Sequence, residues 1–368
     1  MTATGLVDVV CLGESMVTFL PTRPGRLADV PSFVRGIGGA ESNVACGLAS
    51  SGHSAKWVGR VGEDGFGEHL VAAIASYGVD TSAVQRDAHR PTGIYFRTAG
   101  ERATGEQADS QGLQGLQGLQ ELAEVVYYRA GSAASAMSPS TMPADELWSG
   151  RILHLSGITA ALSADCLALM RTLTARAPGR PLISFDVNYR MSLWRDADGR
   201  DADGPRILLD LARGADLVFV GEDEAYAAWG LRGAPAIRAA LPEPEALVVK
   251  QGGQGATAYV RGGEDGTDAV TSVPALDVDV VAPVGAGDAF AAGFLSATLR
   301  GLTAQDRLRH GHLMAAATLT VPGDLAEPPS RAHADRLAAL DDRAWGTLRL
   351  GPGWTAVVAQ DPQEVRTA

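Results

Sequence analysis

The sequence predicts an α/β protein with a mostly parallel sheet, helices on both faces of that sheet, and a small second β-sheet. The first observation is a regular alternation from Ile152 onward, where short apolar runs are followed by segments with helical spacing. Runs such as 152–157 and 181–186 are typical of buried strands, and 163–175 and 222–229 have the spacing of helices. Strands that alternate with helices are joined by right-handed crossovers, which give a parallel sheet covered on both faces.

The second observation is a pair of β-rich segments, 92–98 and 124–130, on either side of a low-complexity stretch in which QGL occurs three times in succession. We expect the two segments to pair as a hairpin, with the repeat as its long solvated loop. Residues 18–36 mix Pro, Arg and Thr without a helical period, and they are expected to add strands to the same small sheet.

One large domain is expected to span residues 1–340. The chain of 368 residues, 46% of them hydrophobic, is long enough to bury one large core. The small sheet is assigned to about 15–37 and 88–131, as an insertion in this domain. The tail, 341–368, is rich in Gly, Trp and Pro and receives no predicted role.

Composition excludes several classes of protein. The net charge is −12, the sequence pI is near 5.0, and no basic stripe occurs, which argues against nucleic acid as a partner. Cys11, Cys46 and Cys166 are widely spaced and form no C-x-x-C motif, so we expect a cytoplasmic protein without structural disulfides or zinc. No signal peptide is evident and no apolar stretch reaches about 18 residues, so no membrane span is expected.

The stretch from Asp277 to Leu299 carries the clearest chemical signal. A short strand pattern ends at Pro283, residues 285–287 form a turn of little bulk, and a helix begins near Asp288. Free N–H groups at a helix N-terminus bind anions, and a carboxylate there can accept a proton from a hydroxyl while the N–H groups stabilise a transferring phosphoryl group. For this motif alone, an N-capping aspartate after a flexible turn remains an equal alternative.

Further polar residues follow predicted strands, where the ligands of parallel sheets bind. Arg190 could grip a carboxylate or phosphate, or could pair with Asp186 and brace the turn. Tyr127 and Arg129 share one face of a strand, from which they could close over a polar substrate or could be half-buried and solvated. Glu224 could hold magnesium through water, or could be an ordinary acid in the first turn of a helix.

Two glycine motifs resemble those of the ribokinase-like (PfkB) carbohydrate kinases. They are Gly38 to Asn43, GGAESN, and Gly285 to Phe290, GAGDAF, and the similarity extends from about Val7 to Leu340. Within the family, the stretches GIYFR, VYYRAGSAASAMSP and DVNYRMSLW are most similar to 2-keto-3-deoxygluconate kinases. The resemblance implies a ribokinase-like fold and transfer of phosphate from ATP, with Mg²⁺, to the terminal hydroxyl of that sugar acid. It also implies that the small sheet is a lid, which in the family often joins subunits of a homo-oligomer.

The resemblance also implies roles for individual residues. Those expected to contact the sugar acid are Gly39, Asn43, Tyr95, Tyr127, Arg129 and Arg190, with the arginines near its carboxylate. Those expected to line ATP are Lys250, Gly252, Gly253, Gly255, Gly285 and Gly287, although a plain turn remains the default for 250–255. Asp288 is expected to be the base, with Gly285, Ala286 and Gly287 as the phosphate cradle, and Glu224 is expected to place magnesium through water.

Three motifs depart from the family pattern. Ala282 and Pro283 replace the usual Asp-Thr or Asp-Pro, Gly221 replaces a polar residue, and His312 aligns with an asparagine often found near adenine. These changes affect nucleotide contacts and magnesium placement, whereas the base and cradle are intact. The alternatives are a kinase for fructose, ribose or 2-keto-3-deoxygalactonate, or a sugar- or nucleotide-binding regulator without catalysis.

Overall fold

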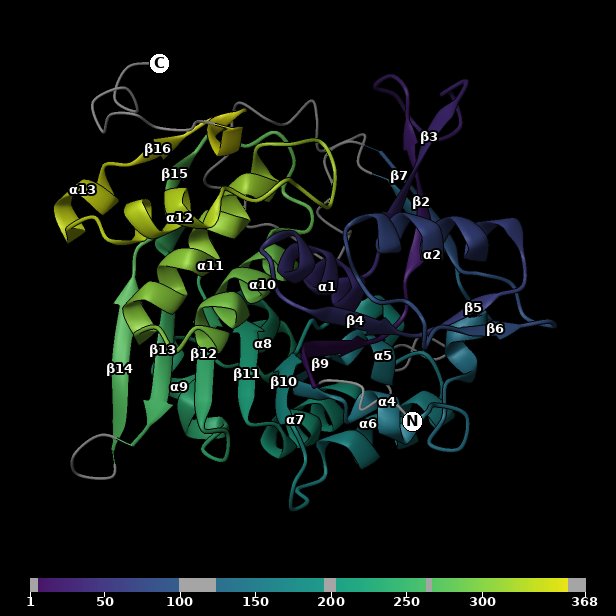
Figure 1. The fold of residues 1–368 in the computed structure, drawn as a ribbon, viewed down its shortest axis with the longest axis horizontal. Helices are drawn as coiled ribbons and strands as arrows, with labels where there is room; N and C mark the ends of the chain where they lie inside the picture. The colour runs from purple at the N-terminus through teal and green to yellow at the C-terminus, as the bar shows by residue number, and fades with distance from the viewer. Residues whose placement is uncertain (1–5, 99–123, 195–202, 263–266, 357–368) are drawn as a thin grey trace.

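A computed structural model describes residues 6–98, 124–194, 203–262 and 267–356, and it is built around an eight-stranded sheet (Figure 1). The strand order is β14-β13-β12-β11-β10-β9-β1-β4. The strands are β1 (Val7–Leu12), β4 (Ala55–Val58), β9 (Gly150–Ser156), β10 (Leu182–Asp186), β11 (Leu217–Gly221), β12 (Ala246–Lys250), β13 (Ala256–Arg261) and β14 (Asp268–Val273). All neighbours from β4 to β12 are parallel, and β13 and β14 add an antiparallel edge.

The central strands are buried on both faces. In β1, the run from Val9 to Leu12 has no exposed surface, although successive side chains point to opposite faces of the sheet. A strand that buries both faces reads as a continuous apolar run rather than an alternating one. This is the pattern that predicted a parallel sheet with two covered faces, and that fold class is confirmed.

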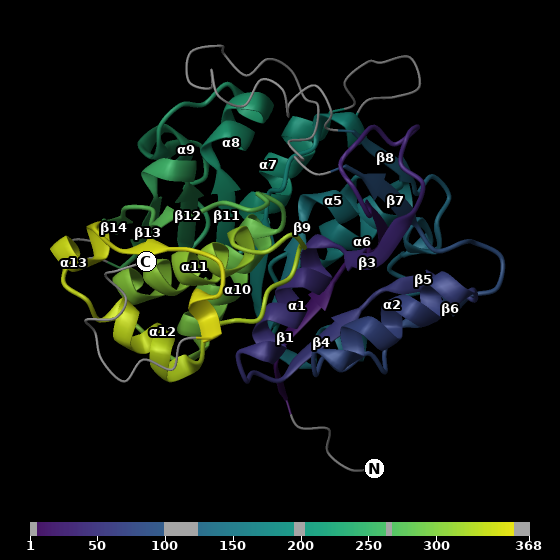
Figure 2. The same ribbon diagram turned by 90° about the horizontal axis from the view of Figure 1, so that it is seen from above.

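Two helical layers enclose the sheet (Figure 2). One layer contains α1 (Ala40–Ser50), α2 (Gly65–Ser76), α10 (Ala286–Leu299), α11 (Ala304–Leu319) and α12 (Arg331–Ala338). The other contains α6 (Ala164–Thr174), α7 (Gly204–Gly214), α8 (Glu222–Trp229) and α9 (Ala234–Ala240). Short helices are α4 (Ala144–Leu147) and α5 (Gly157–Ala160). Each layer packs its own apolar cluster against one face of the sheet.

A separate four-stranded sheet stands to the upper right of the main sheet in Figure 1. Its strands, in spatial order, are β3 (Phe33–Gly38), β2 (Met16–Pro21), β7 (Ile94–Arg97) and β8 (Val125–Tyr128). The predicted hairpin is confirmed, because β7 and β8 pair antiparallel. The QGL repeat that joins them lies outside the described residues.

Two pairs of short strands complete the structure. β5 (Arg60–Gly62) pairs with β6 (Gln85–Asp87), and β15 (Asp277–Val278) pairs with β16 (Arg349–Leu350). The sequence pattern at 57–61 predicts one strand, but the structure divides it at Gly59, where a Cβ would lie 2.8 Å from the carbonyl oxygen of Gly13. The tail also folds in part, with α13 (Asp342–Gly346) before β16. No helix in the described ranges has the length and apolarity needed to cross a bilayer.

Candidate active site

Helix α10 begins after a tight glycine turn. Gly285 has a φ of 74°, in the left-handed region that glycine adopts readily. A Cβ at this position would lie 2.4 Å from the carbonyl oxygen of Asp324, so a side chain does not fit. Among the described residues, no side chain caps this end of the helix. Its first N–H groups are therefore available to an anion.

Asp288 lies in the first turn of α10, and Nδ2 of Asn43 on α1 donates a hydrogen bond of 2.8 Å to its Oδ2. Burial raises the pKa of Asp288 to about 7, and repulsion from Asp186 adds to the rise. The Asn43 hydrogen bond and the charges of Lys250 and Arg190 oppose this rise in pKa. A carboxyl group with a pKa near neutral pH is suited to act as a general base.

Lys250 places a cation beside this turn. Its Nζ donates to Oδ2 of Asp186 at 2.8 Å, and it lies 3.5 Å from where a Cβ on Gly287 would be. Burial opposes the charge of Lys250, but the carboxylates of Asp186 and Glu224 outweigh it and raise the pKa of the amine. The lysine therefore stays protonated next to the free N–H groups of α10.

The remaining residues of the predicted 250–255 turn lie apart from this charge cluster. Gly252 and Gly253 are exposed in a short 3-10 helix, Gly252–Gln254. Gly255 has a φ of 119°, and a Cβ there would lie 2.1 Å from the carbonyl oxygen of Val273. Close backbone packing therefore requires glycine at this position. This fits the alternative in which residues 250–255 form a plain turn.

Arg190 and Glu224 form a loose ion pair, with Nη1 and Oε1 3.5 Å apart. The Arg190 side chain is 45% exposed, so it can still reach a ligand. Oε2 of Glu224 accepts a hydrogen bond of 3.1 Å from the N–H of Gly221, so this carboxylate also caps the N-terminus of its own helix, α8. Burial raises the pKa of Glu224. In place of a bracing contact with Asp186, which was one of the two alternatives for this arginine, Arg190 pairs with Glu224, and Asp186 binds Lys250.

The small sheet brings its predicted residues together. The rings of Tyr95 and Tyr127 have centroids 5.3 Å apart, and the guanidinium of Arg129 lies 5.7 Å from the Tyr127 ring centre. Arg129 forms an ion pair with buried Glu14, and Glu14 also accepts a hydrogen bond of 2.8 Å from Oγ of Ser132. The arginine is thus held in place by a protein carboxylate.

Sequence reasoning missed Glu14 and Asp324. The Tyr95 hydroxyl donates to Oδ2 of Asp324 at 3.1 Å, and Arg97 forms a buried ion pair with the same carboxylate. Gly38 lies beside this group, since a Cβ there would be 2.2 Å from the Tyr95 oxygen. Glu14 follows β1 and could have been found by the rule that identified other residues after strands. Asp324 lies in a loop between two helices, where the sequence carries no comparable signal.

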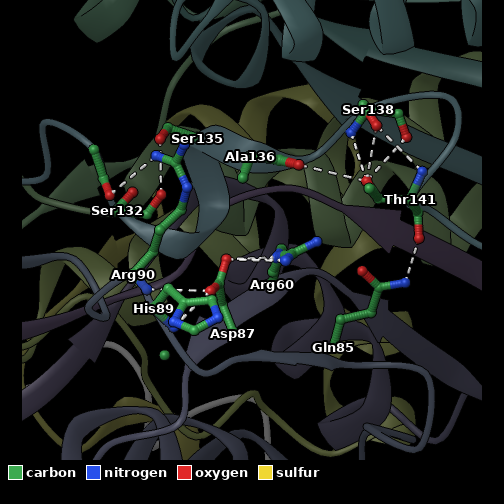
Figure 3. Close-up of polar contacts among 12 residues, drawn as sticks. Arg60, Gln85, Asp87, His89, Arg90, Ser132, Ser135, Ala136, Ser138 and Thr141 are labelled. Atoms are coloured by element: carbon green, nitrogen blue, oxygen red, sulfur yellow. Dashed lines mark hydrogen bonds and ion pairs between the residues drawn. The ribbon is translucent and has the colours of Figure 1, made fainter.

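The turn at residues 62–67, which leads into α2, supports the base of the small sheet. The Asp64 carboxylate accepts hydrogen bonds from the N–H groups of Gly67 at 2.8 Å and Thr92 at 2.8 Å, joining the start of α2 to the approach to β7. Figure 3 shows the neighbouring contacts. Asp87 forms an ion pair with Arg60, and the side-chain amide of Gln85 donates a hydrogen bond to the carbonyl oxygen of Thr141. These contacts join the start of α2, the β5–β6 pair and the approach to β7 at the base of the small sheet.

His312 is a core residue. Its ring lies 5.2 Å from the Phe290 ring and 6.4 Å from the Trp345 ring, and Nε2 is 3.3 Å from the carbonyl oxygen of Val273. Burial lowers its pKa to about 4, so it is neutral at physiological pH.

A divalent cation has suitable oxygen ligands here, although the described part of the chain holds no cluster of three or more His, Cys, Asp or Glu that could bind a metal alone. Oδ1 of Asp186 is buried without a hydrogen-bond partner in the structure. Glu224 lies close enough to influence the same lysine. Magnesium takes most of its ligands from water and substrate phosphates, so two carboxylates suffice.

Comparison with known proteins identifies the class. Residues 7–331 match the "pfkB family carbohydrate kinase". The chain is 35% identical to the 2-dehydro-3-deoxygluconokinase of Bacillus subtilis (strain 168), covering 88% of this chain and 93% of that protein. It is 30% identical to the enzyme of the same name from Thermoproteus tenax, with coverages of 91% and 95%. The crystal structure of a PfkB protein from Polaromonas sp. JS666 superposes with a TM-score of 0.71, at 33% identity, covering 89% and 99%. The chain therefore belongs to the pfkB family of carbohydrate kinases and is a sugar kinase.

Proposed function

We propose that this kinase transfers the γ-phosphoryl group of ATP to the terminal hydroxyl of 2-keto-3-deoxy-D-gluconate, also called 2-dehydro-3-deoxygluconate, to give its 6-phosphate. The observation that carries the proposal is the Asp288 carboxyl, with a pKa raised to about 7, in the uncapped first turn of α10 and near the cations Lys250 and Arg190. The substrate is supported by two relatives that carry this activity in their names.

Phosphoryl transfer needs a base for the hydroxyl and positive charge for the phosphates. In our proposal, Asp288 accepts the proton of the attacking hydroxyl. The N–H groups at residues 285–287 and the Lys250 ammonium stabilise charge on the transferring group. Magnesium, held through water by Asp186 and Glu224, would neutralise the nucleotide phosphates.

The carboxylate of the sugar acid requires a cation. Arg190 is half exposed and only loosely paired, so it is the arginine with capacity for a new carboxylate. Arg129 is already neutralised by Glu14, and we assign it to orient hydroxyls together with Tyr95, Tyr127 and Gly39. Asn43 would contribute through its bond to Asp288.

The small sheet is proposed to act as a lid that excludes water during transfer. Its exposed apolar side chains, Val34, Val126 and Tyr128, are 58%, 40% and 61% exposed. Such side chains suit a contact with a second copy of the chain, and we propose a homo-oligomer formed there. The enzyme is proposed to work in the cytoplasm, where its buried thiols would remain reduced.

The substrate is tested by ADP release from ATP and magnesium with 2-keto-3-deoxygluconate, 2-keto-3-deoxygalactonate, fructose and ribose. The gluconate-derived acid should give the highest kcat/KM, and ³¹P NMR should show a phosphate monoester on its terminal carbon. A higher kcat/KM with fructose or ribose would contradict the assignment of a sugar acid.

Arg190→Ala tests recognition of the carboxylate. Loss of a charge-assisted contact should raise KM for the sugar acid by about tenfold to a hundredfold, while KM for ATP changes little. Arg190→Lys should recover part of the lost affinity for the sugar acid, because the positive charge remains but the bidentate geometry of the guanidinium does not. An unchanged KM for the acid in Arg190→Ala would count against this role.

A further inference from the structure

Residues 342–356 form a C-terminal segment that the proposed function does not explain. The segment contains α13, β16 and a 3-10 turn at Trp354–Ala356, and it lies beyond the residues that match the family, 7–331. Figure 1 shows α13, β15 and β16 together at the upper left, across the molecule from the small sheet. The segment therefore lies away from the small sheet, which carries the predicted sugar contacts Tyr95 and Tyr127.

Trp345 makes the first anchoring contact. The side chain is 1% exposed, and its Nε1 donates a hydrogen bond of 3.0 Å to the carbonyl oxygen of Pro274. The guanidinium of Arg309 lies 4.9 Å from the centre of the Trp345 ring, and Arg309 also pairs with Asp342 at 2.6 Å. A buried tryptophan thus fixes the chain directly after β14.

Strand β16 makes the second contact. It pairs in parallel with β15, and the N–H of Asp279 donates to the carbonyl oxygen of Leu350 at 2.9 Å. The side chain of Asp279 also pairs with Arg349 at 2.7 Å. Together the two contacts hold residues 274–279 at both ends.

Residues 274–279 lie against the 251–255 turn, which follows Lys250, and lead along the chain to the 285–287 turn of the proposed phosphate site. On one side, a Cβ on Gly255 would lie 2.8 Å from Cα of Pro274, so the 251–255 turn packs directly on this segment. On the other side, the chain continues through Ala282, whose N–H donates to Leu319 at 3.3 Å, into Gly285. A shift of residues 274–279 would therefore act directly on the 251–255 turn and, through residues 280–284, on the 285–287 turn.

We propose that the C-terminal segment positions residues 274–279 and thereby sets the affinity for the nucleotide, with Trp345 as the principal positioning residue. This inference rests on the proposed nucleotide site. It assigns to the segment an effect on ATP and no effect on the sugar acid, because its anchoring contacts are made with the chain that packs on the 251–255 turn and leads into the 285–287 turn.

The test is Trp345→Phe, which keeps an aromatic ring in the core and removes the Nε1 hydrogen bond together with one ring of the buried indole. Its matched control is Trp229→Phe, which removes an equivalent bond of 2.7 Å to the carbonyl oxygen of Pro205 on the other face of the sheet. ATP binding is measured by calorimetry without sugar, and KM is measured for both substrates. Trp345→Phe should raise the Kd for ATP by about threefold to tenfold, with KM for the sugar acid within about twofold of wild type. The control should change neither value.

A chain that ends at Asp341 should weaken ATP binding further, by at least about tenfold. If this chain does not fold, the Trp345→Phe comparison decides alone. The inference is overturned if Trp345→Phe leaves the Kd for ATP unchanged, or if it raises the Kd for ATP and KM for the sugar acid by the same factor. Failure of the proposed function is distinguishable, because the wild-type protein would then not bind ATP or would not phosphorylate any sugar tested.

Discussion

Helices α1 and α10 begin in the same way but their first-turn acids are used differently. Each follows a glycine, Gly39 or Gly285, and neither is capped by a side chain within the described residues. Each carries a carboxylate in its first turn, Glu41 in α1 and Asp288 in α10. Both motifs therefore place a carboxylate at the N-terminus of a helix, although only Asp288 was predicted to be a base.

The surroundings separate the two acids. Glu41 is 1% exposed, and its Oε1 accepts hydrogen bonds of 2.8 Å from both Ser156 and Thr159. A Cβ on Gly13 would lie 2.1 Å from its carboxyl carbon, so protein atoms enclose it. Asp288 is partly exposed and accepts a hydrogen bond from Asn43. An enclosed carboxylate that hydroxyl groups already satisfy cannot reach a substrate, whereas Asp288 can.

Asp288→Asn should have the largest effect, because an amide cannot accept the hydroxyl proton. We expect kcat to fall by at least about a hundredfold, with small changes in the Kd of ATP and of the sugar acid. Steady-state kinetics and calorimetry measure the two quantities separately. Near-normal turnover would show that the difference between the two helices is not catalytic.

The same variant changes the pH dependence of stability. The Asp288 pKa is raised from 3.8 to about 7 in the folded state, so the folded state holds a proton that the unfolded state releases between these values. Wild-type stability should therefore lose a contribution as pH rises through this range, and Asp288→Asn should not. The difference in Tm between variant and wild type, followed from pH 5 to 8, should grow in favour of the variant.

Asn43→Ala should have an intermediate effect, because it removes the hydrogen bond that α1 donates to the catalytic base Asp288 in α10. That bond lowers the Asp288 pKa, so its loss should move the pH midpoint of kcat/KM upward and reduce turnover at neutral pH by about tenfold. Asn43→Asp is not a suitable control, because a second charge would raise the same pKa. A lower kcat with an unmoved midpoint would contradict this role.

Glu41→Gln should have the smallest effect. An amide keeps an oxygen acceptor for Ser156 and Thr159 but buries a new donor, which costs about 1–3 kcal/mol of unfolding free energy. Turnover per folded molecule should remain within about threefold of wild type. Denaturant unfolding and active-site titration measure these quantities. A loss of turnover comparable to that of Asp288→Asn would remove the distinction between the two acids.

The fold was largely accessible from the sequence because its signals are local. Apolar runs such as 182–186 identify strands buried on both faces, and Ser163 marks the start of α6 by capping Cys166 at 3.0 Å. The division of the strand at Gly59 was missed, because it depends on contact with a distant backbone segment. The folded tail was also missed, since a two-residue strand such as β16 has no periodicity to detect.

The candidate site was less accessible. The sequence could nominate Asp288 and Arg190, since each stands at the end of a recognisable element. It could not show that Glu14 neutralises Arg129, or that Asp324 receives Tyr95 and Arg97, because these contacts join residues far apart in the chain. Pairing of charges is a property of tertiary structure, and it decides which arginine remains available to a substrate.

The pH dependence of kcat/KM for the sugar acid, measured on the wild-type enzyme at saturating ATP and magnesium, tests the central claim most directly. With Asp288 as a base whose pKa is raised to about 7, kcat/KM should fall tenfold for each pH unit below that value and level off above it. A value of kcat/KM that stays constant between pH 5.5 and 8.5 would contradict the assignment of Asp288 as the base.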